Sequence, residues 1–215
     1  MKEAEHLAEA RAWLEKKDKK LARVIKDVGI CRLEIDAMQS VYQALAESIV
    51  YQQLTGKAAA TIFGRVMTLA GKPAVLDPDD ILAAGEEKLR SVGCSRAKAL
   101  ALLDLSLKTK MGEIPDLVAM ESMSDEELIS HISSVRGIGR WTVEMLMIFR
   151  LGRMDVMPAT DYGIRKGFAL TYKLIDLPAP KEILLHSEKW KPFRSVASWY
   201  LWRSLDPLKP MPQDK

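Results

Sequence analysis

Two short stretches of sequence decide the fold of this chain: Val135-Arg136-Gly137-Ile138-Gly139-Arg140-Trp141-Thr142 and, after an apolar run, Pro158-Ala159-Thr160-Asp161-Tyr162. In the first stretch, two of the three positions in Gly137-Ile138-Gly139 carry no side chain. Glycine permits a tight turn and lets another backbone approach closely. The first stretch therefore predicts a tight turn, and the second places a lone carboxylate a short distance after it.

Helical patterns lie on both sides of the glycine turn. Ser124 and Glu127 have the spacing of a capping box. Apolar residues then recur at i, i+4 and i+7 on one helix face: Leu128, Ile132 and Val135. After the turn, apolar residues from Trp141 to Phe149 mark a second helix. We therefore predict a helix-hairpin-helix over residues 124–150, a motif that binds the DNA backbone without reading its sequence.

The N-terminus of the second helix is expected to bind an anion. The first N–H groups of a helix lack intrahelical acceptors, and the helix dipole favours negative charge at that end. Arg136 and Arg140 flank the turn. A Gly-x-Gly turn between helices can also be a plain tight connection, so the turn alone leaves both interpretations open.

Length and charge are compatible with a DNA-binding protein. The chain has 215 residues, 48% of them hydrophobic, which suits one large domain or two small lobes. Its net charge is +3. Between Arg136 and Lys166, six basic residues face three acidic ones, so this stretch alone has an excess equal to that of the whole chain. Phosphate affinity comes from such local positive charge.

Cysteine and histidine usage disfavours a zinc site or an iron–sulfur cluster. The two cysteines, Cys31 and Cys94, are far apart, and the three histidines are scattered. The sequence shows no signal peptide, and no apolar run approaches membrane-spanning length. We expect a reduced compartment and no membrane partner: the cytoplasm and nucleoid of a prokaryote, or the nucleus of a eukaryote.

Helical signals dominate the whole chain, and alternating strand patterns are nearly absent. The fold class predicted is all-α, with about ten helices. The expected helices are one or two over 3–28, then 37–53, one from Lys57, one from Pro78 to near Gly93 with Asp77 as its cap, one from Ser95, the hairpin pair, one after Asp161, one near Pro180 and a last one from Pro192 to about Leu205.

Asp161 is the candidate catalytic residue. It precedes a helix that begins near Tyr162, so it is first of all a good N-cap. A carboxylate held there can also stabilise the oxocarbenium-like state in which a glycosidic bond breaks. The two roles are compatible, because capping fixes the carboxylate. Asp155 is the rival carboxylate, and its position suggests a surface loop.

Four motifs, in order along the chain, carry a resemblance to a known family. They are IVYQQLTGKAA at 49–59, GCSRAK at 93–98, the glycine turn with Asp161 twenty-two residues past Gly139, and WKPFRS at 190–195. Together they resemble the helix-hairpin-helix (HhH-GPD) superfamily of DNA glycosylases, in the compact form of its 3-methyladenine DNA glycosylase II branch. The resemblance extends from about residue 40 to 203.

The resemblance implies a fold and an activity. It implies a two-lobed all-α fold with the active-site cleft between the lobes, and a single glycosylase domain over 1–215 without an N-terminal β domain. The activity implied is base excision repair: flipping an alkylated purine (3-methyladenine, 7-methylguanine or ethenoadenine) out of duplex DNA and hydrolysing its N-glycosidic bond. The enzyme would act as a monomer and require no cofactor.

Trp141 separates the implied enzyme from its lyase relatives. Lyase-type members of the family place a nucleophilic lysine two residues after the second hairpin glycine, where this chain has Trp141. The resemblance therefore implies a monofunctional enzyme with water as the nucleophile. A non-catalytic helix-hairpin-helix DNA-binding module is the alternative function. A helical scaffold without a nucleic-acid role would explain only the composition.

By the same resemblance, several residues receive roles in the site. Asp161 matches the catalytic aspartate. The base pocket is assigned to Trp141, Met145, Tyr162 and Trp202. An aromatic at 141 suits a flipped, electron-poor purine, although Trp141 can instead pack between helices. Trp202, three residues after Trp199, can instead belong to the core. Met145 replaces an aromatic found in some relatives and leaves the substrate open.

The resemblance also assigns DNA contacts and a cation site. Gln53 matches the wedge that fills the gap left by the flipped nucleotide, with Leu54 as its neighbour. The alternative for Gln53 is a helix-end glutamine bound to backbone. Ser95 would probe the opposite side of the minor groove. The hairpin contacts are Arg136, Gly137, Ile138, Gly139, Arg140 and Thr142. The backbone carbonyls of Ser133, Val135 and Ile138 would hold a structural Na⁺ or K⁺.

Overall fold

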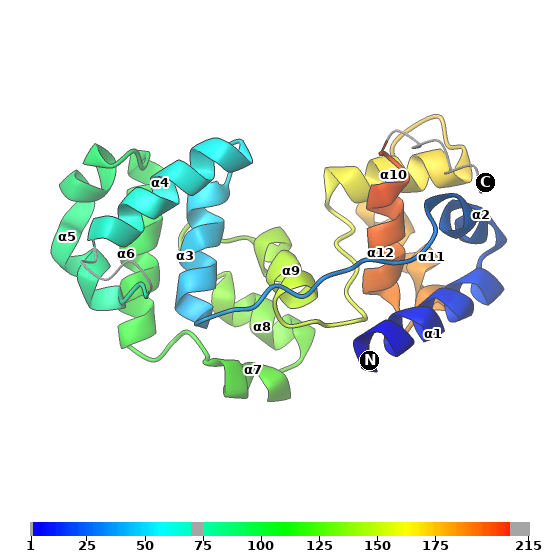
Figure 1. Cartoon of the computed structure of the whole chain (residues 1–215), viewed down its shortest axis with the longest axis horizontal. Helices are drawn as coiled ribbons and strands as arrows, with labels where there is room; N and C mark the ends of the chain where they lie inside the picture. The colour runs from blue at the N-terminus through cyan, green and yellow to red at the C-terminus, as the bar shows by residue number, and fades with distance from the viewer. Residues whose placement is uncertain (1, 70–74, 207–215) are drawn as a thin grey trace, which may run out of the picture. The chain divides into compact units, whose positions relative to one another are not determined.

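The computed structural model describes residues 2–69 and 75–206 of the chain (Figure 1). Within those residues the secondary structure is helical and no strand occurs. This confirms the all-α prediction. The chain divides into two compact units, Met1–Ile35 with Met147–Lys215 (unit 1) and Asp36–Leu146 (unit 2).

Unit 1 is built around α12 (Arg194–Arg203), which packs against α1 (Lys2–Lys17), α2 (Lys19–Val28) and α10 (Tyr162–Tyr172). The remaining helices of unit 1 are α11 (Pro180–Ser187) and the short 3₁₀ helix η1 (Glu188–Trp190). Most of α12 is buried, as expected of a helix with neighbours on several sides. Its Tyr200, together with Trp190 of η1 and Leu21 and Ile25 of α2, is fully buried.

Two glycines of α10 let it approach α12 closely. Gly163 and Gly167 are four residues apart and therefore lie on the same face of the helix. A Cβ at Gly167 would lie 2.2 Å from the carbonyl oxygen of Leu201. At Gly163 it would lie 2.9 Å from both Asp161 Oδ1 and Trp202 Cδ1. Only glycine allows the two helix backbones to pack at this distance.

A buried carboxylate ties α2 to the C-terminal half of unit 1. Asp18 caps α2 by accepting the N–H groups of Lys20 and Leu21 at 3.0 and 3.1 Å. Its other oxygen accepts hydrogen bonds from four side chains: Tyr172, His186, Lys189 and Trp190. Burial alone would raise the pKa of this carboxyl, but the hydrogen bonds from His186, Lys189 and Tyr172 outweigh it and hold the pKa well below its usual range.

Unit 2 consists of six helices and the start of a seventh. They are α3 (Val41–Tyr51), α4 (Gly56–Leu69), α5 (Pro78–Ser91), α6 (Arg96–Lys110), α7 (Leu117–Ser122), α8 (Asp125–Ile132) and α9 (Arg140–Phe149), whose last residues belong to unit 1. Helix α6 packs against α5 and α3. Leu45, Ile49, Leu102 and Leu105 are among the fully buried residues of this core.

The capping signals read from the sequence are confirmed. Ser124 and Glu127 form the capping box of α8. Asp77 caps α5, with Pro78 in its first turn, and Ser95 caps α6. Asp161 caps α10. Each of these signals acts over two or three residues, which is why the sequence alone reveals it.

The last helix begins at Arg194, two residues later than the predicted start at Pro192. Pro192 and Phe193 belong to a turn that precedes the helix. Phe193 N–H closes this turn by donating to the Trp190 carbonyl at 2.8 Å. Helix α12 begins only at Arg194, where Ser195 N–H donates to Met154 O at 2.9 Å. An N–H of the first turn of α12 is thus bound by a carbonyl distant in sequence. A local signal such as Pro192 could not reveal this contact.

No helix among residues 2–69 and 75–206 combines the length and apolar character needed to cross a membrane.

Candidate active site

The carboxylate of Asp161 is fixed at the N-terminus of α10. Its Oδ1 accepts the N–H of Ile164 at 2.8 Å, the N-cap bond that the sequence predicts. The same oxygen accepts the indole N–H of Trp202 at 2.8 Å. Two donors on one oxygen, one from backbone and one from a rigid ring, restrict the rotation of the carboxylate. The structure therefore brings together two of the residues assigned to the site, Asp161 and Trp202.

Trp202 is itself held by its neighbours. Its ring stacks on Phe149, with the ring centroids 5.7 Å apart and the planes inclined by 29°. Gly163 lies against the edge of the same ring, where an added Cβ would meet Cδ1 at 2.9 Å and Nε1 at 3.1 Å. The indole is half-buried. The alternative interpretation of Trp202 as a plain core residue is therefore incomplete, because its indole N–H donates a hydrogen bond to Asp161.

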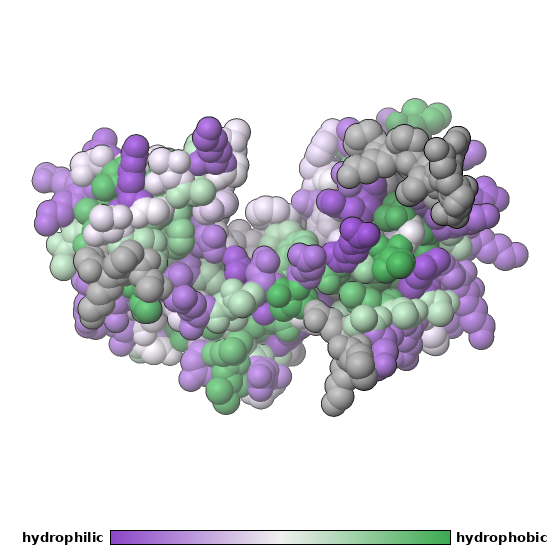
Figure 2. Space-filling view, viewed as in Figure 1, coloured by the Kyte–Doolittle hydropathy of each residue, from purple (hydrophilic) through white to green (hydrophobic). Residues whose placement is uncertain are grey.

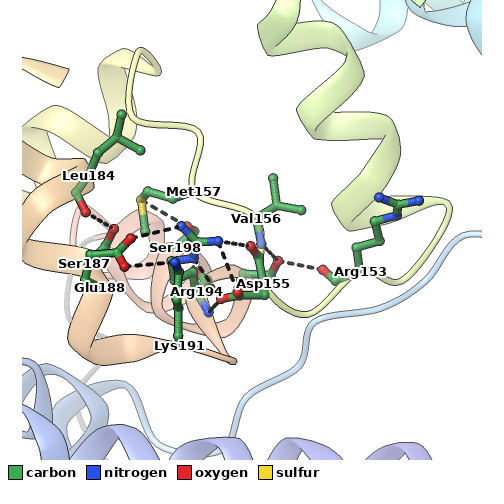
Figure 3. Close-up of polar contacts among 11 residues, drawn as sticks. Arg153, Asp155, Val156, Met157, Leu184, Ser187, Glu188, Lys191, Arg194 and Ser198 are labelled. Carbon is green, nitrogen blue, oxygen red and sulfur yellow. Dashed lines mark hydrogen bonds and ion pairs between the residues drawn. The ribbon is translucent and has the colours of Figure 1, made fainter. Parts of the chain in front are cut away.

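The loop that leads to Asp161 is fastened along α12 (Figure 3). Ser195 Oγ donates to Arg153 O at 2.6 Å and accepts Val156 N–H at 3.0 Å. One turn further along α12, Ser198 Oγ lies 3.7 Å from the sulfur of Met157. Asp161 then meets Trp202, one more turn along the same helix. Helix α12 thus positions the whole segment from Arg153 to Asp161.

Asp155, the rival carboxylate, belongs to this fastening. Its Oδ1 accepts Arg194 Nε at 2.8 Å and its Oδ2 accepts Arg194 Nη2 at 3.0 Å, a bidentate pair (Figure 3). Oδ1 also accepts the backbone N–H of Arg194 at 3.3 Å, at the start of α12. Such fork geometry is strong and directional. Asp155 lies in a turn and its side chain is 34% exposed, in agreement with the prediction of a surface loop residue, and the pair commits its carboxylate to anchoring α12.

The glycine turn of the hairpin has the geometry that the sequence suggested. Gly137 has φ +78°, a left-handed conformation that favours glycine. A Cβ at Gly139 would meet no atom within 4 Å, so the backbone is open at that point. Helix α9 follows directly with Arg140 as its first residue. The N-terminus of α9 therefore borders an open backbone surface, as an anion site requires.

Two further loops of unit 2 adjoin this turn. Gln52 Nε2, at the end of α3, donates to Gly137 O at 3.0 Å. Lys98 Nζ, in the first turn of α6, donates to Val50 O at 2.7 Å and so caps the C-terminus of α3. Burial lowers the pKa of this ammonium. The three motifs at residues 49–59, 93–98 and 135–142, distant in sequence, are thus brought together in unit 2.

Gln53 is displayed at the tip of one of these loops. It is exposed and has φ +56°, a left-handed conformation unusual for a residue other than glycine. Leu54, beside it, is also exposed. The helix-end glutamine bound to backbone is in fact Gln52, the preceding residue. Backbone strain of this kind concentrates at functional positions, which favours the wedge interpretation for Gln53.

The hairpin arginines already have partners on the protein. Arg140 forms a bidentate pair with Glu126, at 2.9 and 2.6 Å, and the hydrogen bond from Arg140 lowers the pKa of Glu126. The side chains of Arg140 and Glu126 are 46% and 74% exposed, so the pair contributes little stability. The backbone N–H of Arg136 donates to Asp104 Oδ2 at 2.7 Å, which anchors the turn to α6.

The remaining assigned residues differ in exposure. Trp141 and Met145 lie four residues apart on α9, hence on one face, and Trp141 is 45% exposed. Tyr162, the first residue of α10, is 65% exposed. The side chains of Ile138 and Thr142 are buried. Any contact of these two with DNA must therefore be made through their backbone.

Several residues with a clear structural role were given none by sequence reasoning. Gln52 and Lys98 stand inside the quoted motifs, and their bonds to Gly137 O and Val50 O show why those positions matter. Gly163, which directly follows Tyr162, makes room for the bond between Trp202 and Asp161. For Gly163 the only available signal was a glycine inside a helix pattern.

Among the described residues, no group of three or more His, Cys, Asp or Glu side chains could hold a metal ion. The proposed cation ligands are backbone carbonyls, to which this finding does not apply. One observation fits them: the hydroxyl of Ser133 is buried without a hydrogen-bond partner in the described part of the chain. Orphaned buried oxygens of this kind are often satisfied by an ion or an ordered water. The carbonyl of Val135 accepts Ile138 N–H at 3.1 Å and keeps a second lone pair.

Comparison with known proteins agrees with this geometry. The family described as HhH-GPD superfamily base excision DNA repair protein matches residues 46–193, more than half of the chain. DNA-3-methyladenine glycosylase 1 of Schizosaccharomyces pombe is 38% identical over 199 residues, which cover 92% of this chain and 87% of that protein. The resemblance drawn from the four motifs is confirmed.

Two solved structures are similar to the whole fold. Schizosaccharomyces pombe 3-methyladenine DNA glycosylase (Mag1) in complex with abasic DNA gives a TM-score of 0.81 at 38% identity, over 91% of this chain and 95% of that one. DNA-3-methyladenine glycosidase from Bacillus halodurans gives a TM-score of 0.79 at 32% identity, over 89% and 86%.

Proposed function

Because the chain belongs to the HhH-GPD superfamily of base excision DNA repair proteins, we propose that it is a DNA-3-methyladenine glycosylase that hydrolyses the N-glycosidic bond of alkylated purines. Its substrates are lesions in duplex DNA: 3-methyladenine, 7-methylguanine and ethenoadenine. The observation that carries this proposal is the fixed carboxylate of Asp161, held by Ile164 N–H and Trp202 Nε1 at the position of the family's catalytic aspartate.

Asp161 acts on the sugar through its negative charge. As the base leaves, positive charge develops on the ring oxygen and C1′, and a carboxylate fixed nearby stabilises it without reorganising. The same carboxylate orients or deprotonates the attacking water.

The leaving group needs little help from an acid. 3-Methyladenine and 7-methylguanine carry a positive charge and leave readily as neutral bases. Selectivity then comes from the weakened glycosidic bond and from the easier flipping of a damaged base. Trp141 is the proposed stacking surface for this cationic ring, with a cation–π contribution; Met145, Tyr162 and Trp202 complete the proposed base pocket.

The enzyme is proposed to be a glycosylase without lyase activity. A β-lyase needs an amine that attacks C1′ and forms a Schiff base. The position that supplies this amine in lyases is occupied here by Trp141. Water is then the nucleophile, and the product is an abasic site in an intact strand.

DNA binding is proposed for the exposed backbone of the hairpin and for the loops beside it. In this proposal, a DNA phosphate binds at Gly139 and the N-terminus of α9 and replaces Glu126 as the partner of Arg140. Gln53, with Leu54 beside it, fills the space of the flipped nucleotide, and Ser95 lies at the loop that probes the other strand. We propose that the protein acts as a monomer in the nucleoid or the nucleus, where its DNA substrate is.

A structural Na⁺ or K⁺ remains part of the proposal. The carbonyls of Ser133, Val135 and Ile138 would hold it, and the orphaned hydroxyl of Ser133 lies in the same loop. Such an ion supplies positive charge next to the hairpin phosphate. The chemistry on the base requires no cofactor.

One assay tests the function directly. The protein is incubated with methylated duplex DNA, and both free base and strand breaks are measured. Release of 3-methyladenine, with strand breaks only after alkali, is the expected result. Strand breaks without alkali would overturn the assignment as a monofunctional enzyme. Binding without base release would instead show the non-catalytic module. A panel of duplexes with single lesions then ranks the substrates.

A further inference from the structure

A cavity lies in unit 1 at the end of α10 that is remote from Asp161. It has a volume of about 380 Å³ and is lined by residues of α2, of the last turn of α10 and by Ser204. Asp161 caps the opposite end of α10, an eleven-residue helix, so about 15 Å of helix separates the two features. The cavity is therefore distinct from the proposed active site.

The rim of the cavity is basic. Lys20, Arg23 and Lys173 line it, against one acidic residue, Asp27. Lys20 Nζ lies 5.4 Å from the centre of the Tyr172 ring. Within residues 2–69 and 75–206, neither Arg23 nor Lys173 forms an ion pair with a carboxylate. Two cations without an ion-pair partner among the described residues therefore lie at one opening, and the complementary ligand is an anion.

Three apolar side chains line the walls of the cavity. Val24, Val28 and Leu170 line the cavity. Leu170 is 59% exposed, and Ile175, a few residues further along the chain, is 100% exposed. Figure 2 shows hydrophobic surface where the chain leaves α10. Exposed apolar residues beside polar ones are typical of an interaction site.

This combination favours a protein partner over DNA. A DNA phosphate backbone would be attracted by the cations of the rim, but it has no apolar group that could fill the cavity. A peptide that alternates acidic and apolar residues matches both features, because its carboxylates reach the rim and its apolar side chain fills the cavity. A volume of about 380 Å³ accommodates one or two such side chains.

We propose that this surface, the α2–α10 surface formed by Lys20, Arg23, Val24, Val28, Leu170 and Lys173, binds an acidic peptide segment of a partner protein through one or two apolar anchor residues. The surface lies on the helix whose other end carries Asp161. A partner bound at the last turn of α10 would therefore not cover Asp161, which caps the first turn.

A selection with random peptides tests the proposal on the full chain. A phage library of random 12-residue peptides is selected against the protein, and the recovered peptides are synthesised with a fluorescent label. We expect Asp or Glu next to Leu, Ile or Phe in the recovered sequences. Arg23→Glu should weaken their binding at least about fivefold, since it reverses a rim charge.

Lys26→Glu is the matched control. Lys26 lies on the same helix but does not line the cavity, so the same charge change there should alter affinity by less than about twofold. Circular dichroism and base release from methylated DNA should be unchanged in both variants. Equal effects of the two substitutions would show non-specific charge attraction and would overturn the proposal.

Three other results would also overturn it. The first is failure to recover acidic peptides. The second is displacement of a recovered peptide by an undamaged 12-base-pair duplex, which would make the surface part of the DNA path. The third is binding only to a chain that ends at Asp206, which would show that the last nine residues of the chain occupy the surface themselves.

Discussion

At the scale of single residues, Asp161 combines two roles that one substitution can separate. Its Oδ1 caps α10 and accepts the Trp202 indole N–H. Asparagine is an equally good N-cap and its amide oxygen accepts the same two bonds. Asp161→Asn therefore removes the negative charge and leaves the local structure in place.

We expect Asp161→Asn to reduce base release about 10²–10³-fold or more, because the charge that stabilises the oxocarbenium state is gone. Affinity for abasic duplex DNA should stay within about twofold of the wild type. Single-turnover release of 3-methyladenine and fluorescence anisotropy measure the two quantities. Turnover retained in the variant would remove Asp161 from catalysis.

Trp202→Phe tests the other half of the site. Phenylalanine keeps a ring for the stack on Phe149 but has no N–H for Asp161. Hydrogen bonds to charged groups contribute about 1.5–3 kcal/mol, so single-turnover base release should fall at least about tenfold. Trp199→Phe, a change of the same kind on the same helix, is the control and should leave the rate nearly unchanged.

The two residues also differ in how far the sequence reveals them. The cap at Asp161 is a local signal, because the acceptor and the Ile164 N–H are three residues apart. The bond from Trp202 spans forty-one residues and depends on how α10 and α12 pack. No periodicity or spacing encodes that contact, so Trp202 could be placed only by resemblance, and its hydrogen bond could not be predicted.

At the scale of elements, the role of the hairpin can be tested by a substitution at Gly139 that the fold accommodates. Gly139→Ala places a methyl group where no atom lies within 4 Å, and the φ of Gly139 is not in the left-handed region. Its effect on the free energy of unfolding should be within about 0.5 kcal/mol.

The affinity of Gly139→Ala for duplex DNA should fall about tenfold for any sequence, and the salt dependence of binding should weaken by about one phosphate contact. Anisotropy titrations at several salt concentrations measure both; unchanged affinity and slope would remove this backbone from the interface.

The close crossing of α10 and α12, in contrast, depends on a glycine that cannot be replaced without a clash. Gly167→Ala would place a Cβ 2.2 Å from the Leu201 carbonyl oxygen. The two backbones must then move apart, at a cost of about 1–3 kcal/mol. Gly64→Ala, in α4, meets no atom within 4 Å and should be neutral or stabilising by about 0.4–1 kcal/mol. Urea unfolding compares the two variants, and a Gly167→Ala protein as stable as Gly64→Ala would contradict the close packing.

Helix positions could be predicted well where caps are local and poorly where they are not. The starts of α5, α6, α8 and α10 followed from Asp77, Ser95, Ser124 and Asp161. The start of α12 did not follow from Pro192, because Met154 O and the side chain of Asp155 serve its first turn from a distant loop.

At the scale of the whole molecule, Asp18 makes stability depend on acid. The folded-state pKa of its carboxyl is held well below the unfolded value of about 3.9, by hydrogen bonds that outweigh burial. A lowered pKa means that the ionised group stabilises the fold above about pH 4, and that this contribution is lost as the pH falls from there towards the folded-state pKa.

Asp18→Asn should therefore lower the free energy of unfolding by about 2–4 kcal/mol at pH 7, since four side-chain donors lose their charged acceptor. The difference from the wild type should narrow between about pH 4 and pH 2. Urea unfolding at a series of pH values measures it. The exposed Asp176→Asn is the control. If the free energies of unfolding of the wild type and Asp18→Asn differ by the same amount at every pH down to 2, the role of Asp18 is contradicted.

This network was beyond sequence reasoning. Asp18 stands in a run of lysines and looks like a charged surface residue, yet it is buried. Its partners Tyr172, His186 and Trp190 come from the far end of the chain. The all-α class, the hairpin and the motif order could be predicted because their signals are local or belong to the family.

Unit 1 is assembled from both ends of the chain, and this sets the order in which the protein can fold during its synthesis. Unit 2 is one continuous segment and can fold while the ribosome is still translating. Helices α1 and α2 leave the ribosome before α12, against which both of them pack. At roughly 5–20 residues per second their apolar faces stay uncovered for on the order of ten seconds or more. Leu14, Leu21 and Ile25, which are fully buried in the folded protein, therefore lack their α12 neighbours throughout that interval.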